Sequence, residues 1–248
     1  MKILLTNDDG IFAPGIRALC KELEKDHDVT VVAPDRERSA AGHAITIHYP
    51  LRVKEMEFDG IESKCIAVDG TPADCVKIAY EALIEEEIDL LISGINIGPN
   101  LGRDVLYSGT VSAAIEGLLL GLPSIAVSLV ADDHWDFKDS AKYMRKFVKE
   151  YQQQRLKKDV LLNINIPIDY KEETKVTELG DKGYTNRFEE RFDPREQKYY
   201  WLAGELVEEG TAEGTDVTAA KNDFISITPI KLNLTSHEHL DELKKWDI

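Results

Sequence analysis

The chain begins by alternating short apolar runs with a stretch of helical spacing. Residues 3–5 (Ile-Leu-Leu) are typical of a strand that is buried on both faces. Between Pro14 and Lys25 the apolar residues recur on one face of a helix, and a β-branched run follows at residues 28–33. A helix between two buried strands forms a βαβ unit, whose crossover is right-handed in nearly every case. The start of the chain therefore predicts a parallel sheet in an α/β fold.

The same alternation continues to about residue 168. Thr71, Pro72 and Asp74 form a capping box with a proline in the first turn, which predicts a helix to about Glu86 with Tyr80 facing inward. Further strands are expected at 44–48, 51–56, within 61–68, and at 88–92, 124–130 and 160–166, and further helices at 108–120 and 139–151. We therefore predict a mainly parallel sheet flanked by helices for residues 1–168.

The composition changes at about Asp169. Residues 169–222 are rich in charges, are interrupted by glycines and show only a weak strand pattern, so they can hardly form a core of their own. We interpret them as an extended hairpin that reaches another subunit and serves oligomerisation. An apolar strand at 223–228 and a short helix at 235–246 then complete a third part, residues 223–248.

Composition limits the partners. The formal net charge of the 248-residue chain is −16, which disfavours a nucleic-acid duplex or an anionic membrane as partner but not a small anionic substrate. No apolar run approaches the ~18 residues of a membrane span, and only Met1 and Lys2 precede the first strand, so no signal peptide is expected. Cys20, Cys65 and Cys75 are odd in number and widely spaced, which favours reduced thiols and a cytoplasmic location.

Two adjacent carboxylates, Asp8 and Asp9, stand where the first buried strand is predicted to end. Like charges this close repel and raise each other's pKa unless a cation lies between them. A divalent metal ion would make the pair stable, and open α/β sheets bind ligands beyond the carboxyl ends of their strands. The alternative is a solvated turn, because Asn, Asp and Gly are the commonest turn residues. The pair alone does not decide between the two interpretations.

Three more loops are predicted at the same edge of the sheet: Ser39–His43, Asn96–Asn100 and Ser108–Thr110. The second lies in a Gly- and Asn-rich stretch where backbone can approach a ligand closely, although it lacks the dinucleotide fingerprint. The third, Ser-Gly-Thr at a helix start, offers N–H groups, two hydroxyls and the positive end of the helix dipole to a phosphate. Ordinary capping, the alternative, needs one hydroxyl and no glycine.

Together these loops offer two carboxylates, a hydroxyl and an amide oxygen, which are ligands suited to Mg²⁺ or Mn²⁺ and unsuited to structural zinc. A metal ion beside an anion-binding site is the arrangement that hydrolysis of a phosphoryl group requires. The metal polarises a phosphoryl oxygen and lowers the pKa of a bound water, while donors around the phosphate stabilise the charge of the transition state.

Several motifs that occur in order along the chain resemble those of the SurE family, the stationary-phase survival proteins. These segments are Leu5–Gly10, Ala33–Ser39, Gly70–Val76, Ser93–Asn96 and Tyr107–Val111. Two segments near the end, Gly214–Asp216 and Ser226–Pro229, also fit. Any one of these motifs is unspecific, whereas five in order are highly specific.

The resemblance implies a Rossmann-like core, a metal-dependent phosphatase acting on nucleoside 5′- or 3′-monophosphates, and a homodimer or homotetramer built by exchange of the C-terminal segment. It leaves a side activity on short polyphosphate open. It implies that one divalent ion per subunit, Mg²⁺ or Mn²⁺, is bound by Asp8, Asp9, Ser39 and Asn96. It also implies that the substrate phosphate is bound by Asn100, Ser108, Gly109 and Thr110.

Three hypotheses are weighed for the site. In the first, a metal-activated water attacks the phosphorus and either Asp8 or Asp9 acts as the base. In the second, an aspartyl-phosphate forms, but the known enzymes of that kind have a spacer between their two acids. In the third, the scaffold is a non-catalytic nucleotide sensor, which the intact set of metal ligands disfavours. His43 is the one histidine in a site loop and receives no role, and Arg36 is expected to pair with acids.

Overall fold

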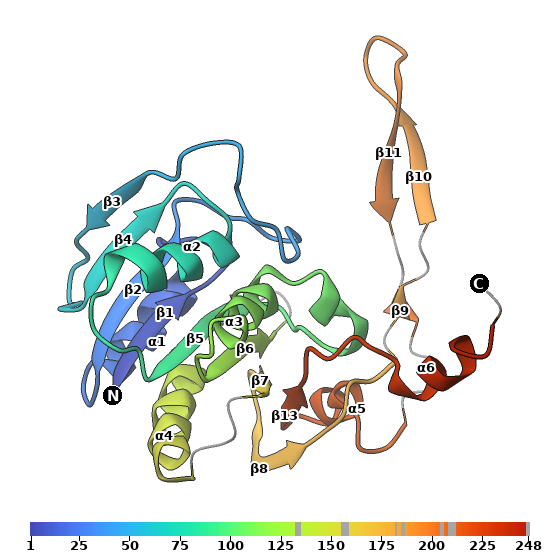
Figure 1. Cartoon of the computed structure of the whole chain (residues 1–248). Helices are drawn as coiled ribbons and strands as arrows, with labels where there is room; N and C mark the ends of the chain where they lie inside the picture. Colours follow the sequence, from blue (N-terminus) through green and yellow to red (C-terminus); the bar gives the residue numbers. More distant parts are fainter. Residues whose placement is uncertain are drawn as a thin grey trace.

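The computed structural model describes residues 1–131, 135–154, 159–181, 183–184, 187–203, 206–207 and 212–246. Within these residues, nine strands form one sheet in the order β3-β4-β2-β1-β5-β6-β7-β13-β8 (Figure 1). The middle of the sheet consists of β2 (Asp28–Pro34), β1 (Lys2–Thr6), β5 (Leu90–Ile97), β6 (Ser124–Val130) and β7 (Leu161–Pro167). The edges consist of β3 (Val53–Met56) with β4 (Lys64–Val68), and of β13 (Phe224–Ile230) with β8 (Lys171–Val176).

The strands from β4 to β7 in this order run parallel to one another. β3 is antiparallel to β4, and β13 is antiparallel to β7. β1 pairs with β2 on one side and with β5 on the other. The connections after β1 and before β5 therefore lead to opposite sides of β1, which makes this place a topological switch point. The predicted α/β fold with a mainly parallel sheet is confirmed.

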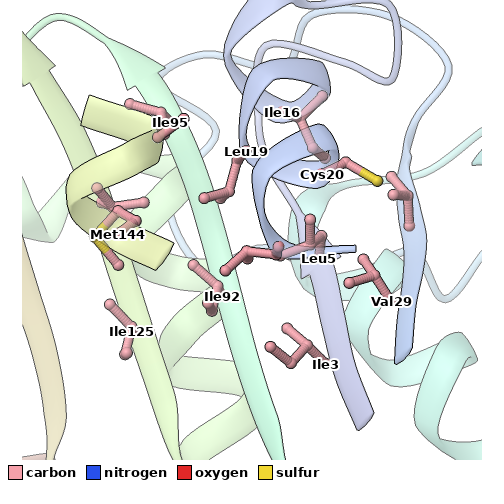
Figure 2. Packing of buried hydrophobic residues seen from close by; sticks show 14 of the residues in the cluster. Ile3, Leu5, Ile16, Leu19, Cys20, Val29, Ile92, Ile95, Ile125 and Met144 are labelled. Atoms are coloured by element: carbon pink, nitrogen blue, oxygen red, sulfur yellow. The ribbon is translucent and has the colours of Figure 1, made fainter. Parts of the chain in front are cut away.

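Helices cover both faces of the sheet. α1 (Pro14–Leu23) and α4 (Lys138–Gln154) contact each other over one core, and α2 (Pro72–Ile78) and α3 (Gly109–Leu119) lie together over another. The predicted inward face of α1 is confirmed, and Figure 2 shows Leu19 beside Leu5 and Ile92 of the sheet. These three side chains are fully buried, and each contributes about 2 kcal/mol of hydrophobic stabilisation.

The helix after the capping box differs from the prediction. The capping box is present, with the hydroxyl of Thr71 accepting from the N–H of Asp74 and the Asp74 carboxylate accepting from the N–H of Thr71. However, α2 ends at Ile78 and continues as a π-helical turn, Ala79–Leu83. The wider turn rotates the following side chains, so Tyr80, predicted to face inward, is exposed.

Two strand predictions in the first part are corrected. Residues 44–48 do not form a strand, because hydrogen bonds to the start of α2 hold Ala44 and Thr46 instead. β5 continues to Ile97, beyond the predicted strand end at residue 92 and into the predicted loop Asn96–Asn100. Its register with β6 shifts between Ser93 and Asn96. At that shift a Cβ on Gly94 would lie 2.2 Å from the carbonyl oxygen of Val127, so only glycine fits.

Residues 169–222 contain more than a hairpin. β8 joins the main sheet, and α5 (Asp216–Lys221), which the sequence did not predict, contacts β13. β10 (Arg187–Phe192) and β11 (Lys198–Ala203) form an antiparallel ribbon that extends away from the sheet in Figure 1. β9 (Gly183–Tyr184) pairs with β12 (Leu206–Val207), and α6 (His237–Leu243) follows β13. The division into 1–168, 169–222 and 223–248 stays a prediction.

Among the helices found in these ranges, none has the length and apolar character that crossing a membrane requires.

Candidate metal and phosphate site

The acid pair lies at the switch point of the sheet. β1 ends at Thr6, and Asn7-Asp8-Asp9-Gly10 follows at its carboxyl end. The amide of Asn7 donates to the carbonyl of Gly10 over 2.9 Å and so closes the turn. The parallel neighbours β2 and β5 end at the same edge, which brings the loops after them beside this turn.

Asp8 is in contact with the start of α3. The hydroxyl of Thr110 donates a short hydrogen bond to Oδ1 of Asp8. A Cβ added to Gly109 would lie 2.7 Å from Oδ2 of Asp8, so only glycine allows this approach. Burial raises the pKa of the Asp8 carboxyl, and the bond from Thr110 opposes the shift. Asp8 therefore joins the acid pair to the predicted phosphate seat.

Asp9 faces the end of β5. Its Oδ2 accepts from the backbone N–H of Ile97 over 3.3 Å. Burial, followed by the negative charge of Asp8, raises the pKa of Asp9 to about 7. The arginines of the neighbouring loop do not relieve this repulsion, because Arg36 and Arg38 both pair with Asp69, at 2.8 and 3.1 Å. The prediction that Arg36 pairs with acids is confirmed.

The loop after β2 brings Ser39 to this edge. The backbone N–H of Arg38 donates to the carbonyl of Asp8 over 2.7 Å, which ties the two loops together. The Ser39 hydroxyl donates to the carboxylate of Glu37 over 2.8 Å, and its oxygen lone pairs are then available to a cation. The negative charge of Glu37 adds to the raised pKa of both Asp8 and Asp9, a role that the sequence did not reveal.

Asn96 stands near the end of β5, beyond the register shift. Its Nδ2 donates to the carbonyl of Gly98 over 2.7 Å. This bond orients the amide so that Oδ1, an acceptor only, is available to a cation.

The donor set of these residues fits a hard divalent cation. Asp8 and Asp9 offer carboxylate oxygens whose pKa values are raised in the absence of a cation, and Ser39 and Asn96 each keep an acceptor oxygen. In the part of the chain that the structure describes, no cluster of three or more His, Cys, Asp or Glu suited to a metal is found. A metal here would thus depend on the hydroxyl and amide oxygens as well as on the two carboxylates.

The start of α3 is the place where the phosphate-binding site is predicted. Ser108 is the N-cap, and its hydroxyl accepts from the backbone N–H of Val111 over 3.1 Å. Capping therefore uses the hydroxyl of Ser108, and the hydroxyl of Thr110 is used by Asp8. What this helix start offers an anion is its remaining backbone N–H groups and the positive end of its dipole.

Asn100 is held by a buried amide network. Its backbone N–H donates to Oδ1 of Asn165 over 2.8 Å, and its carbonyl accepts from the amides of Asn163 and Asn165. Its own Nδ2 lies 2.8 Å from the hydroxyl of Ser128. The network fixes the backbone of the loop between β5 and α3, a role of the two β7 asparagines that the sequence did not reveal.

The predicted residues thus fall into three groups. Asp8 is joined directly to Gly109 and Thr110, and Asp9 to the end of β5. Ser39 and Asn96 lie in the adjoining loop and strand end. Asn100 and Ser108 are engaged in the amide network and the helix cap. Their roles as metal or phosphate ligands stay predictions.

The fold and this edge define a class: an α/β protein with a pair of adjacent carboxylates beside a helix N-terminus at the switch point of its sheet. The sequence model of the family described as Survival protein SurE matches residues 3–186. The chain belongs to the SurE family.

Curated relatives match it over nearly its whole length. It is 52% identical over 246 residues to "5′-nucleotidase SurE" of Pelotomaculum thermopropionicum, covering 99% of this chain and 95% of the relative. It is 50% identical over 253 residues to the protein of that name from Carboxydothermus hydrogenoformans, covering 99% and 96%. The crystal structure of the SurE protein from Aquifex aeolicus is similar with a TM-score of 0.86 and 41% identity over 98% of each chain.

Proposed function

We propose that this chain is a 5′-nucleotidase that hydrolyses nucleoside 5′-monophosphates to nucleoside and phosphate with one divalent metal ion per subunit. Relatives that are 50% and 52% identical to this chain in sequence are named for this activity. The observation that carries the metal requirement is the acid pair itself. The buried Asp8 carboxylate contacts the start of α3, and the partly buried Asp9 carboxylate faces the end of β5. Both carboxyls have raised pKa values, which a cation would relieve.

In this proposal Asp8, Asp9, Ser39 and Asn96 hold the ion. When bound, a divalent ion supplies Lewis-acid polarisation and neutralises negative charge at the phosphate. The N–H groups at the start of α3 bind phosphate oxygens and stabilise the charge that spreads over them in the transition state. The amide network around Asn100 keeps this helix start and the strand end of β5 in a fixed relation.

Asp9 is the better candidate for the group that accepts a proton. Its Oδ2 accepts a long bond of 3.3 Å from the backbone N–H of Ile97, and a carboxylate oxygen can also accept a proton from a water. Asp8, by contrast, already accepts the hydroxyl hydrogen of Thr110. We therefore assign Asp8 to holding the ion and the helix start, and Asp9 to holding the ion and also orienting the attacking water.

The test is phosphate release from a panel of 5′- and 3′-mononucleotides and short polyphosphate, with Mn²⁺ and with chelator. We expect turnover of 5′-mononucleotides that chelator abolishes. Asp8→Asn should reduce turnover at least about 100-fold with an unchanged circular dichroism spectrum. Asp59→Asn, at an exposed turn, is the matched control and should behave like the wild type. Full activity of the Asp8→Asn variant would contradict the assignment of Asp8 to the metal site.

The second candidate is a nucleotide sensor without turnover. The observation that favours it is that the Ser108 and Thr110 hydroxyls are engaged in structure and not offered to a substrate. Calorimetry distinguishes the two: tight binding of a nucleoside monophosphate in Mn²⁺ with no phosphate release supports the sensor. The same panel decides on 3′-nucleotides and polyphosphate.

A further inference from the structure

The segment that follows the Ser39 loop is attached to α3. The backbone N–H of Gly42 donates to the carbonyl of Tyr107, the residue before the cap of α3, over 3.2 Å. Nε2 of His43 lies 2.8 Å from Oε2 of Glu116, two turns further along the same helix. The first contact lies just before the helix whose start faces Asp8, and the second lies on that helix.

The same segment is attached to the start of α2. The Thr71 hydroxyl donates to the carbonyl of Ala44 over 2.7 Å. The Asp74 carboxylate uses one oxygen for the capping box and accepts with the other from the backbone N–H of Thr46 over 2.8 Å. The Gly70–Val76 motif, which the sequence explained as capping alone, thus also holds residues 44–46.

Glu116 is a buried acid that the proposed chemistry does not use. Its side chain is 8% exposed, and its other oxygen, Oε1, lies 3.6 Å from Nζ of Lys77. A buried carboxylate is strongly destabilising without partners, so it demands the donors that His43 and Lys77 supply. Of these two, His43 belongs to the segment that leads from Ser39, while Lys77 belongs to α2.

Ser39 lies between two fixed points of the chain. On one side, Arg38 is bound through its N–H to the carbonyl of Asp8 and through its guanidinium to Asp69. On the other side, Gly42 and His43 are bound to α3. Ala40 lies between these points and Gly42 lies at the second. Their φ angles are 55° and 58°, so the chain turns sharply there. Releasing one fixed point frees the loop that carries Ser39.

We propose that His43 and Glu116 are positioning residues that fasten the Ser39 loop to α3 and so preorganise the metal site. The inference rests on the proposed function, because it takes Ser39 as a metal ligand. His43 acts through the loop and not on the substrate: its Nε2 is directed at a carboxylate along α3 and away from the acid pair at the helix start. Partners outside the ligand shell commonly change metal affinity 10- to 100-fold.

The experiment measures Mn²⁺ affinity from the electron paramagnetic resonance signal of free Mn²⁺, without substrate. His43→Ala removes the donor and should weaken binding about tenfold. Glu116→Gln keeps an acceptor oxygen for the ring and should weaken it less. His48→Ala, an exposed histidine a few residues further along, is the matched control and should bind like the wild type. Thermal melts without metal establish that each variant is folded.

Turnover gives the second readout. The Mn²⁺ concentration that gives half of full activity should rise about tenfold in His43→Ala, with kcat at saturating Mn²⁺ within about twofold of the wild type. Equal Mn²⁺ affinity in the wild type and in both variants overturns the inference and leaves the proposed function standing. A wild type that binds no Mn²⁺ overturns both. If His43→Ala changes the unfolding temperature but not the Mn²⁺ affinity, the His43–Glu116 pair is purely structural, and the inference is overturned as well.

Discussion

Burial raises the pKa of the Asp9 carboxyl to about 7, and the charge of Asp8 adds to the shift. The unfolded chain releases this proton near pH 4. Between these values the folded protein therefore binds more protons than the unfolded one, so this group makes the fold less stable as the pH rises. The site is thus held at a cost in stability that a bound cation would remove.

The first prediction at this scale concerns Asp9→Asn in the metal-free protein. We expect the variant to unfold at a higher temperature than the wild type at pH 8, with the difference shrinking towards pH 4. The pKa shift of Asp9 corresponds to at most about 4 kcal/mol of unfolding free energy. Solvent screening at this partly exposed side chain reduces the expected gain in stability to about 1–2 kcal/mol. Calorimetric melts across the pH range measure it. A difference that does not change with pH would contradict the argument.

The second prediction concerns Gly109→Ala. The added methyl would lie 2.7 Å from Cβ and Oδ2 of Asp8, so the carboxylate or the helix start must move. A displacement of this kind at a reacting centre costs about 100-fold in rate, and the crowding costs about 1–3 kcal/mol of stability. Phosphate release and urea unfolding report the two effects separately. An active variant with the wild-type rate would show that Asp8 need not touch α3.

Sequence analysis found the residues whose chemistry is visible locally. Asp8 and Asp9 stand out because two adjacent acids after a buried strand demand an explanation, and Ser108 because a cap precedes a helical pattern. Glu37 and Asn165 were missed as parts of the site. The charge of Glu37 acts on Asp8 and Asp9, and Asn165 bonds to Asn100, and only the fold brings these residues together. A buried polar side chain has no local signature that separates it from an exposed one.

At the scale of elements, α5 joins the two halves of the chain through one buried carboxylate. Asp216, at the start of α5, is fully buried and accepts from the N–H groups of Gly102 and Gly180 at 2.9 and 2.8 Å. Gly102 follows the loop that carries Asn100, and Gly180 precedes the ribbon. The carboxylate therefore fixes the phosphate loop and the root of the ribbon to the same helix.

The third prediction is that Asp216→Ala destabilises the protein by about 2–5 kcal/mol, because it leaves two buried N–H groups without acceptors. Since the loop after β5 loses its support, the KM for nucleotide should rise as well. Urea unfolding and steady-state kinetics measure these changes. Glu213→Ala, at an exposed residue just before α5, is the control. A variant with wild-type stability would show that solvent reaches these groups.

Elements with strong local signals were predicted well, and those fixed by tertiary contacts were not. The cap of α3, the strand β6 and the inward face of α1 agree with the sequence pattern. Residues 44–48 have the alternation of a strand, yet the side chains of Thr71 and Asp74 at the start of α2 bond to the backbone of Ala44 and Thr46. The short helix α5 escaped because its six residues give too little periodicity to recognise.

At the scale of the whole molecule, the ribbon of β10 and β11 exposes apolar side chains far from the core. The most exposed are Phe188, Phe192, Trp201 and Leu202, each at least 60% exposed. A two-stranded ribbon is marginally stable alone, and exposed aromatic side chains are typical of protein interfaces. Both features support the proposal that the protein is a homodimer or homotetramer.

The fourth prediction follows. Replacing residues 187–203 with a short Gly-Ser turn should reduce the assembly measured by light scattering after gel filtration. The main sheet pairs through other strands, so its unfolding temperature at a fixed protein concentration should fall by only a few degrees. A four-residue substitution, Phe188, Phe192, Trp201 and Leu202 each to Thr, keeps the ribbon and should have the same effect. A wild type that is monomeric would contradict the proposal.

The place of β13 has a consequence for how the protein is made. β8 pairs with β13 and with no other strand of the described sheet, while β13 pairs with β7 on its other side. During synthesis the ribosome releases residues 171–176 well before residues 224–230, so the earlier strand must wait without its partner. Until the last segment emerges, the nascent chain presents β7 as an open edge to any neighbouring polypeptide. Stop codons shortly before Phe224 should therefore yield aggregates and not a smaller working enzyme.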